Sequence, residues 1–218
     1  MQLAPRAVIF DLDGTLVDSL EDIATALDLA LDDHDLARPT RELVRRWIGG
    51  GARNLIVHAV GEDRAESVLA RFRVHYTAQP VVHTALYAGI DAVLDRFTAN
   101  DLRLAVLSNK PDALTKRICE VVLARWSFAP VFGQRAHVAL KPSPDAALEV
   151  AAALDIAPAH CAFVGDSAID IHTAQAAQMI PVGVSWGFRP RTELAAANPA
   201  LIADAPADLL ILSGSRAS

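Results

Sequence analysis

Short apolar runs recur along the chain, and polar residues follow each of them. The runs are Ala7 to Phe10, Leu102 to Leu107, Cys161 to Val164 and Ile180 to Val184. Uninterrupted runs of this length are typical of strands buried on both faces of a parallel sheet. Helical patterns lie between them, as at Pro144 to Leu154 and Ala168 to Gln178. This alternation predicts an α/β fold with a parallel sheet covered by helices on both faces.

The interval from about Ser19 to His83 has a different pattern, with helical periodicity and no clear strand. Within it, Leu20 to Leu31 and Ala65 to Tyr76 place apolar residues at three- and four-residue steps, as two packed helices require. Three glycines from Gly49 onward interrupt the interval. We therefore predict an all-helical cap domain at residues 18–83, inserted into a Rossmann-like core domain made of residues 1–17 and 84–218.

Composition narrows the possible partners and location. The 218 residues are 52% hydrophobic and 21% charged, as expected of a folded domain with an insertion. The net charge of -6 argues against nucleic acid, which binds to basic faces, and favours a small molecule. We expect no secretory signal or membrane span, and the distant Cys119 and Cys161 indicate neither a disulfide nor a zinc site. The prediction is a cytoplasmic monomer or homodimer with reduced cysteines.

The first apolar run leads into Asp11 and Asp13. Residues two apart on an extended chain project to the same side, so both carboxyls can face one pocket while Leu12 turns away. Gly14 then permits a tight turn. Two close carboxylates repel each other unless a cation neutralises them or one takes a proton. The pair therefore indicates either a hard metal or acid–base chemistry, and the alternative is a solvated acidic turn.

Other candidate groups follow the later strands, at the edge where parallel sheets bind ligands. Ser108 and Asn109 could bind phosphate oxygens through a hydroxyl and backbone N–H groups. Lys141 could supply a positive charge to a phosphoryl group. Asp166 ends another buried run, and a helix beginning near Ser167 would return Asp170 to the same side. Each feature alone has an ordinary structural explanation, and their common position at strand ends gives them weight.

Four segments carry a family resemblance that spans essentially the whole chain. DLDGTLVDS, SNKP, LKPSPD and VGDSAID resemble the four motifs of the haloacid dehalogenase superfamily of phosphohydrolases. The helical insertion resembles the first type of cap in that superfamily. Among its subfamilies the chain is most similar to the phosphoglycolate phosphatases. The resemblance implies a Mg²⁺-dependent phosphatase that acts on a small phosphorylated metabolite.

The resemblance also implies roles for particular residues. Asp11 would be the nucleophile that forms an aspartyl-phosphate, and Asp13 would be the acid and then the base. The Mg²⁺ ligands would be Asp11, the backbone carbonyl of Asp13, and Asp166, with Asp170 binding directly or through water. The phosphoryl oxygens would be held by Ser108, Asn109 and Lys141.

Several related chemistries can be separated by residues. Asp13 argues against dehalogenation, for which the family pattern has no second aspartate in the first motif. The predicted cap has no lysine to form the Schiff base of a phosphonatase. A β-phosphoglucomutase-like phosphomutase and a pyrophosphatase of the same superfamily stay open. A phospho-acceptor signalling module is disfavoured, because its acceptor follows a middle strand and it lacks a helical cap.

The cap should set specificity by closing over the site. Arg45, Arg46 and Arg53 flank the glycine run, and an arginine fork could pair with a carboxylate such as that of phosphoglycolate. The alternative for each arginine is a solvated helix face. One departure from the family pattern is Gln178, which stands where these proteins usually carry the glycine that ends a helix.

Overall fold

A six-stranded sheet forms the centre of the molecule, in the order β5-β4-β1-β6-β7-β8 with every neighbouring pair parallel. The computed structural model describes residues 4–214. The strands are β1 (Ala7–Phe10), β4 (Arg103–Pro111), β5 (Phe128–Gln134), β6 (Cys161–Gly165), β7 (Ile180–Val184) and β8 (Leu201–Ala203). The chain order reverses beside β1, so β1, β4 and β6 bring their carboxyl ends together at the place where open α/β sheets bind ligands.

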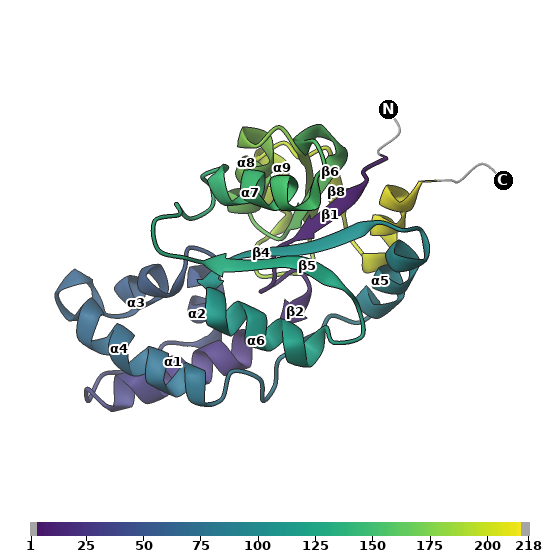
Figure 1. The fold of residues 1–218 in the computed structure, drawn as a ribbon. Helices are drawn as coiled ribbons and strands as arrows, with labels where there is room; N and C mark the ends of the chain where they lie inside the picture. The colour runs from purple at the N-terminus through teal and green to yellow at the C-terminus, as the bar shows by residue number, and fades with distance from the viewer. Residues whose placement is uncertain (1–3, 215–218) are drawn as a thin grey trace.

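Helices cover both faces of this sheet, as Figure 1 shows. They are α5 (Ile90–Ala99), α6 (Asp112–Val122), α7 (Asp145–Leu154), α8 (Ala168–Ala176) and α9 (Arg191–Ala196), with two 3₁₀ turns, η1 (Pro158–His160) and η2 (Pro206–Ser213). Side chains of β1 alternate between two apolar cores. Val8 and Phe10 pack in the core that includes α5 and α6, whereas Ala7 and Ile9 pack in the core of α7 and α8. The predicted α/β fold with a doubly covered parallel sheet is confirmed.

Four helices follow β1 and its loop, and they pack on one another beside the sheet. They are α1 (Leu20–Asp32), α2 (Arg41–Trp47), α3 (Ala52–Val60) and α4 (Glu62–Ala78). Their buried apolar residues form a cluster of their own, which also takes in Leu114 and Phe188 from the rest of the chain. We call α1–α4 the cap. A short antiparallel ribbon of β2 (Val17–Asp18) and β3 (Ala85–Leu86) lies where the chain enters and leaves it.

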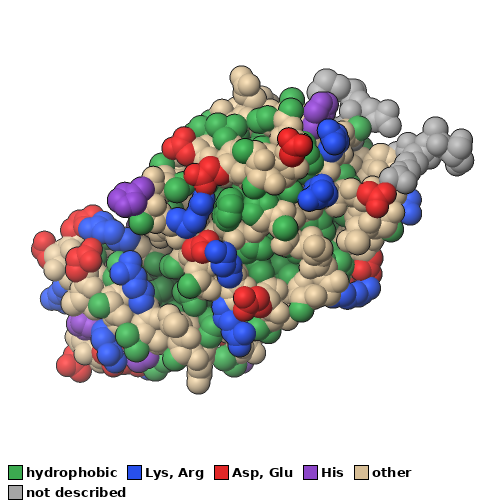
Figure 2. Space-filling view, viewed as in Figure 1, with side chains coloured by type: hydrophobic (Ala, Val, Ile, Leu, Met, Phe, Trp, Pro, Cys, Tyr) green, Lys and Arg blue, Asp and Glu red, His purple; other side chains and the backbone are tan. Residues whose placement is uncertain are grey.

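This ribbon lies at the predicted boundaries between cap and core, at 17/18 and 83/84. The assignment of residues 1–17 and 84–218 to one core domain stays a prediction, and its ends at 1–3 and 215–218 lie outside the described residues. Both faces of the molecule's central sheet are closed by apolar clusters, while on the surface in Figure 2 acidic and basic side chains are interspersed. Within residues 4–214, no helix combines the length and apolar character needed to cross a membrane.

The sequence pattern missed two edge strands. In β5, Pro130 and Gly133 interrupt the apolar run, and such residues are tolerated at a sheet edge because one side of the strand has no partner. In β8, only three residues pair. The prediction also differs from the structure at β4, which extends through Ser108 and Asn109 instead of ending before them.

Gln178 adopts the backbone conformation for which the family pattern uses glycine. Its φ is 58°, in the left-handed region, immediately after α8. The chain reversal there is closed by a hydrogen bond from the Met179 N–H to the Ala174 carbonyl at 2.8 Å. A side chain at this position costs about 1 kcal/mol relative to glycine. The structure keeps the turn although the residue is unfavourable.

Asp22 ties the first cap helix to the segment that returns to the core. Its carboxylate accepts hydrogen bonds from the backbone N–H groups of Val82 at 3.0 Å, His83 at 3.0 Å and Thr84 at 2.8 Å, and from the Thr84 hydroxyl at 2.6 Å. Burial alone would raise the pKa of Asp22, but these hydrogen bonds outweigh it and hold the pKa below its usual value. The cap therefore begins and ends at one buried carboxylate.

We expect Asp22→Asn to destabilise the protein by about 2 kcal/mol, because the amide group places a donor where N–H and O–H groups need an acceptor. Urea unfolding at neutral pH measures the loss. The matched control is Glu21→Gln, since Glu21 is the exposed neighbour and pairs with Arg41 at 3.1 Å. The control should change the free energy of unfolding by less than about 0.5 kcal/mol. Equal stability of the two variants would contradict the assignment.

Candidate active site

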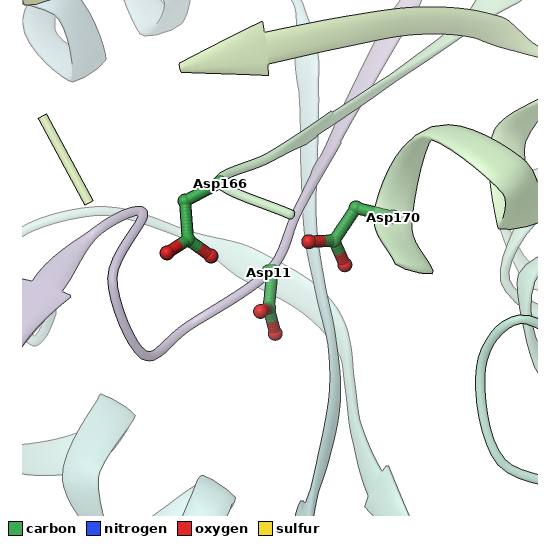
Figure 3. A group of neighbouring side chains, drawn as sticks. All are labelled: Asp11, Asp166 and Asp170. Carbon is green, nitrogen blue, oxygen red and sulfur yellow. The ribbon is translucent and has the colours of Figure 1, made fainter. Parts of the chain in front are cut away.

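Three carboxylates meet at the carboxyl edge of the sheet. Asp11 follows β1, Asp166 follows β6, and Asp170 lies in the first turn of α8. One ligand oxygen from each lies within 4.8 Å of the others, and all three side chains are buried. Figure 3 shows the three side chains beside one another, each extending from a different element. Of the four aspartates predicted to meet at this edge, Asp11, Asp166 and Asp170 therefore lie together.

The charges in this cluster are unbalanced. Burial raises the pKa of Asp11 to about 6, with Lys141 opposing the shift and Asp170 adding to it. Burial, together with Asp170 and Asp11, also raises the pKa of Asp166 well above its usual value. Lys141 Nζ lies 2.9 Å from Asp11 Oδ1 and 2.6 Å from Asp170 Oδ1. One ammonium among three carboxylates leaves the cluster in need of further positive charge.

A divalent cation fits this donor set. The ligands are carboxylate oxygens, which hard cations prefer. The Asp11 Oδ1 atom is buried and takes part in no well-aligned hydrogen bond with the described residues. Gly14 and Gly187 lie so close to Asp166 that neither position has room for a side chain. A Cβ on Gly14 would stand 2.3 Å from Asp166 Oδ2, and a Cβ on Gly187 would stand 2.3 Å from Asp166 Cβ. The two glycines thus leave Asp166 room to reach the cluster.

Asp170 is held by its own helix. Its Oδ2 accepts hydrogen bonds from the Ser167 N–H at 3.1 Å and the Ser167 hydroxyl at 2.6 Å. Its Oδ1 lies against Lys141, as described above. Both carboxylate oxygens therefore already have partners, which makes Asp170 well suited to orient Lys141 beside Asp11.

Asp13 faces a different part of the site. Its carboxylate accepts hydrogen bonds from the Ser19 hydroxyl at 2.5 Å and from Lys110 Nζ at 2.7 and 2.6 Å. Burial would lower the pKa of Lys110, but Asp13 outweighs it and keeps the ammonium charged. Neither Ser19 nor Lys110 has a role predicted from the sequence. Both belong to the quoted motifs, so motif membership was the signal that could have found them.

The predicted phosphate-binding residues surround Asp11 in different ways. Ser108 is buried, and its Oγ accepts a hydrogen bond from the Lys110 N–H at 3.3 Å. The Asn109 amide is engaged with backbone, since its Nδ2 donates to the Lys141 and Gly49 carbonyls, each at 3.1 Å, and its Oδ1 accepts from the Lys141 N–H at 2.9 Å. The Asn109 side chain therefore holds two loops in place, and its amide group is already engaged with the main chain.

The three cap arginines, predicted to meet the substrate, are not among the residues that line the cavity above Asp11. Arg45 donates to the Gly187 carbonyl, and Arg46 pairs with Glu42 on its own helix. Arg53 pairs with two α4 carboxylates at 2.6 and 3.3 Å. Each guanidinium group is therefore already paired. Arg46 and Arg53 pair within the cap, and Arg45 pairs with the core.

The cap is closed onto the core by hydrogen bonds to its main chain. Arg189 donates to the Arg45 carbonyl at 3.0 Å and to the Ile48 carbonyl at 2.5 Å, at the carboxyl end of α2. The neighbouring Phe188 packs in the cap cluster, and its N–H donates to Asp166 Oδ2 at 2.6 Å. One short segment therefore contacts both the acidic cluster and the cap.

Fold and site together define a Rossmann-like α/β protein with a helical cap and a group of buried carboxylates at the carboxyl ends of its strands. The chain belongs to the haloacid dehalogenase-like hydrolase family, whose model matches residues 8–184. It is 33% identical to a phosphoglycolate phosphatase of Aquifex aeolicus, over 95% of this chain and 96% of that protein. It is 34% identical to phosphoglycolate phosphatase 1 of Pseudomonas aeruginosa, over 94% of this chain and 79% of that one.

A solved structure is similar over nearly the whole chain as well. The crystal structure of a predicted phosphoglycolate phosphatase from Haemophilus somnus superposes with a TM-score of 0.89 at 30% identity, covering 96% of this chain and 98% of that one. The resemblance drawn from the four motifs is confirmed at the level of the family.

We expect a divalent cation to stabilise the wild type, because it relieves repulsion among the three carboxylates. At a cation concentration of 100 times the dissociation constant, the gain in the free energy of unfolding should be about 2.7 kcal/mol. Asp166→Asn should lose this gain and, in chelator, should be about 1 kcal/mol more stable than the wild type. Thermal unfolding with and without the cation measures both effects.

The control for that experiment is Asp63→Asn, on the exposed surface of α4. It should keep the whole cation-dependent gain. An equal gain for wild type and Asp166→Asn would show that the cation binds elsewhere.

The metal-free protein should also lose stability as the pH rises. Because the folded-state pKa of Asp11 is about 6 and the ordinary value is 3.8, the folded state keeps a proton that the unfolded state releases between these values. The stabilisation that comes from the protonated Asp11 is fully present below about pH 4 and is lost as the pH passes about 6. Relative to Asp11→Asn, wild-type stability should fall by on the order of 2–3 kcal/mol across this window. Urea unfolding in chelator from pH 4 to 7 measures the difference, which a constant value would contradict.

Proposed function

We propose that this protein is a Mg²⁺-dependent phosphatase whose substrate is phosphoglycolate or a closely similar short phosphate monoester. The observation that carries the proposal is the buried Asp11 carboxylate, which lines a cavity closed by the cap and has Lys141 and the acidic cluster beside it. The names of the relatives support phosphoglycolate as the substrate. The free, buried Cys119 and Cys161 are compatible with a cytoplasmic location, which is part of the proposal.

In the first step, an Asp11 carboxylate oxygen attacks the phosphorus atom, and the bond from phosphorus to the ester oxygen breaks. Asp13 donates a proton to the departing alkoxide, which leaves as an alcohol. Its carboxylate lines the same cavity as Asp11, two residues away on the chain, so both groups can reach one phosphoryl group. The product on the enzyme is an aspartyl-phosphate at Asp11.

In the second step, the Asp13 carboxylate takes a proton from a water molecule, whose oxygen attacks the phosphorus atom. The bond from phosphorus to Asp11 breaks, and inorganic phosphate leaves with Asp11 and Asp13 restored. Hydrogen bonds from Ser19 and Lys110 hold the Asp13 carboxylate in a fixed orientation. Asp13 is therefore positioned to act in both steps from one place.

Charge on the transferring phosphoryl group would be offset by fixed groups of the core. Lys141, pinned between Asp11 and Asp170, supplies a positive charge beside the nucleophile. Ser108 and the backbone N–H of Asn109 would donate hydrogen bonds to phosphoryl oxygens. A bound Mg²⁺, held by Asp11, Asp166 and the Asp13 carbonyl, with Asp170 as a ligand or beside it, would supply Lewis-acid stabilisation of that charge.

The size of the cavity favours a short substrate. Its volume is about 50 Å³. A single water needs roughly 10–15 Å³ on this measure, so the closed cavity has room for about three to five waters. A two-carbon ester therefore requires less opening of the cap than a hexose phosphate does.

We expect Asp11→Asn to lower kcat for phosphoglycolate by about 10⁴-fold or more, because the amide cannot attack phosphorus. Phosphate release with Mg²⁺ measures the rate. The control is Asp18→Asn in the same segment, whose exposed side chain accepts a hydrogen bond from the Leu20 N–H at 3.2 Å. It should keep activity within about 2-fold, since asparagine also accepts such a bond.

A panel of phosphate monoesters, glucose phosphates and pyrophosphate assigns the reaction in the same assay. Hydrolysis of short monoesters is the expected result. Retained turnover by Asp11→Asn would overturn the nucleophile assignment, and interconversion of glucose phosphates without phosphate release would identify a mutase.

A further inference from the structure

The cavity above Asp11 has two unlike ends. At one end lie the reacting groups, Asp11, Asp13 and Ser108. At the other end the cap contributes neutral residues, namely Ile23, Ile48, Gly49, Gly51, Ala52, Leu55, Phe72 and Tyr76. The part of the substrate that becomes the leaving alcohol has to lie at this second end.

Lys110 is the exception to the neutral surroundings. Among the described residues that line the cavity, it carries the only positive charge. Its ammonium lies 4.9 Å from the centre of the Tyr76 ring and contacts both oxygens of Asp13. Only 6% of the residue is exposed, so its charge acts at short range in a low-dielectric space.

Tyr76 adds a hydrogen-bond donor without an acceptor. Its hydroxyl is buried, and its proton has no acceptor among the described residues, because the neighbouring Lys110 ammonium can only donate. Burial raises the pKa of Tyr76 to about 12, with Lys110 opposing the shift and Asp13 adding to it, so the hydroxyl keeps its proton. A buried donor that lacks a partner is costly, and an acceptor on a ligand would satisfy it.

Lys110 and Tyr76 determine which kind of ligand group fits beside them. Lys110, although paired with Asp13, and the Tyr76 hydroxyl both offer hydrogen-bond donors to the cavity, which fits an anionic acceptor on the ligand better than a second cation. The cap arginines that sequence analysis assigned to this task point elsewhere. We propose that Lys110 and Tyr76 form the subsite that binds the carboxylate of the substrate, an inference that rests on the proposed phosphatase function.

The position of Lys110 also limits the length of the substrate. The ammonium lies 2.6 Å from Asp13, the group that would protonate the ester oxygen. A carboxylate paired with Lys110 therefore lies close to that ester oxygen. This spacing favours a phosphorylated hydroxy acid with a single carbon between the ester oxygen and the carboxyl group.

The test compares phosphoglycolate with 2-hydroxyethyl phosphate, which carries a neutral hydroxymethyl group in place of the carboxylate. The readout is the ratio of the two kcat/KM values, phosphoglycolate over 2-hydroxyethyl phosphate. A change in the reactivity of Asp13 alters kcat/KM for both esters and therefore cancels in this ratio. Lys110→Met should lower this ratio by about 100-fold, mainly through the KM of phosphoglycolate. Tyr76→Phe, which removes only the hydroxyl group, should lower it by about 10-fold.

Two further variants separate charge from packing. Lys110→Arg keeps the positive charge and should retain more of the ratio than Lys110→Met. Lys116→Met removes an exposed lysine that pairs with Asp112 at 2.6 Å, and it should leave the ratio unchanged. An equal loss for both esters in Lys110→Met would show that Lys110 only positions Asp13 and would overturn the subsite.

Binding without turnover keeps this inference separate from the proposed reaction. Calorimetric titration of Asp11→Asn with each ester should show tighter binding of phosphoglycolate, and Asp11→Asn combined with Lys110→Met should lose that preference. Such a preference in a protein that hydrolyses neither ester would support the subsite and refute the phosphatase. Hydrolysis of both esters with no preference in binding would refute the subsite alone.

Discussion

The crowding of Asp11, Asp166 and Asp170 at one edge of the sheet is the constraint on which the rest of the site depends. Buried carboxylates this close raise one another's pKa and destabilise the folded state unless positive charge is added. Lys141 supplies part of it. The remaining negative charge is what a divalent cation would offset, so in the proposed function the repulsion among these carboxylates would favour metal binding.

The surrounding structure fixes this cluster from several sides. Asp170 is held at the start of its helix, and Asp166 accepts a hydrogen bond from the Phe188 N–H. The next residue, Arg189, binds the end of α2 in the cap. Two adjacent residues therefore join the acidic cluster to the cap.

The core and the cap contribute different kinds of residue to the cavity. The core holds the charged groups on strand ends, where a rigid sheet fixes their spacing. The cap offers mainly apolar and glycine positions to the cavity, with Tyr76 as its polar contribution. The proposed discrimination among phosphate esters would then rest on the core residue Lys110, which lines the cavity that the cap encloses, rather than on charges in the cap.

The sequence by itself determined the family, the parallel sheet and the convergence of the strand-end carboxylates, because buried strands and their polar ends leave a local signal. It did not reveal β5, since Pro130 and Gly133 mask an edge strand whose pairing depends on a distant neighbour. Only the tertiary structure decided that the cap arginines face away and that Lys110 and Tyr76 meet. Such contacts join residues far apart in the chain, and the direction of a long side chain is set by the nearest acceptor in space.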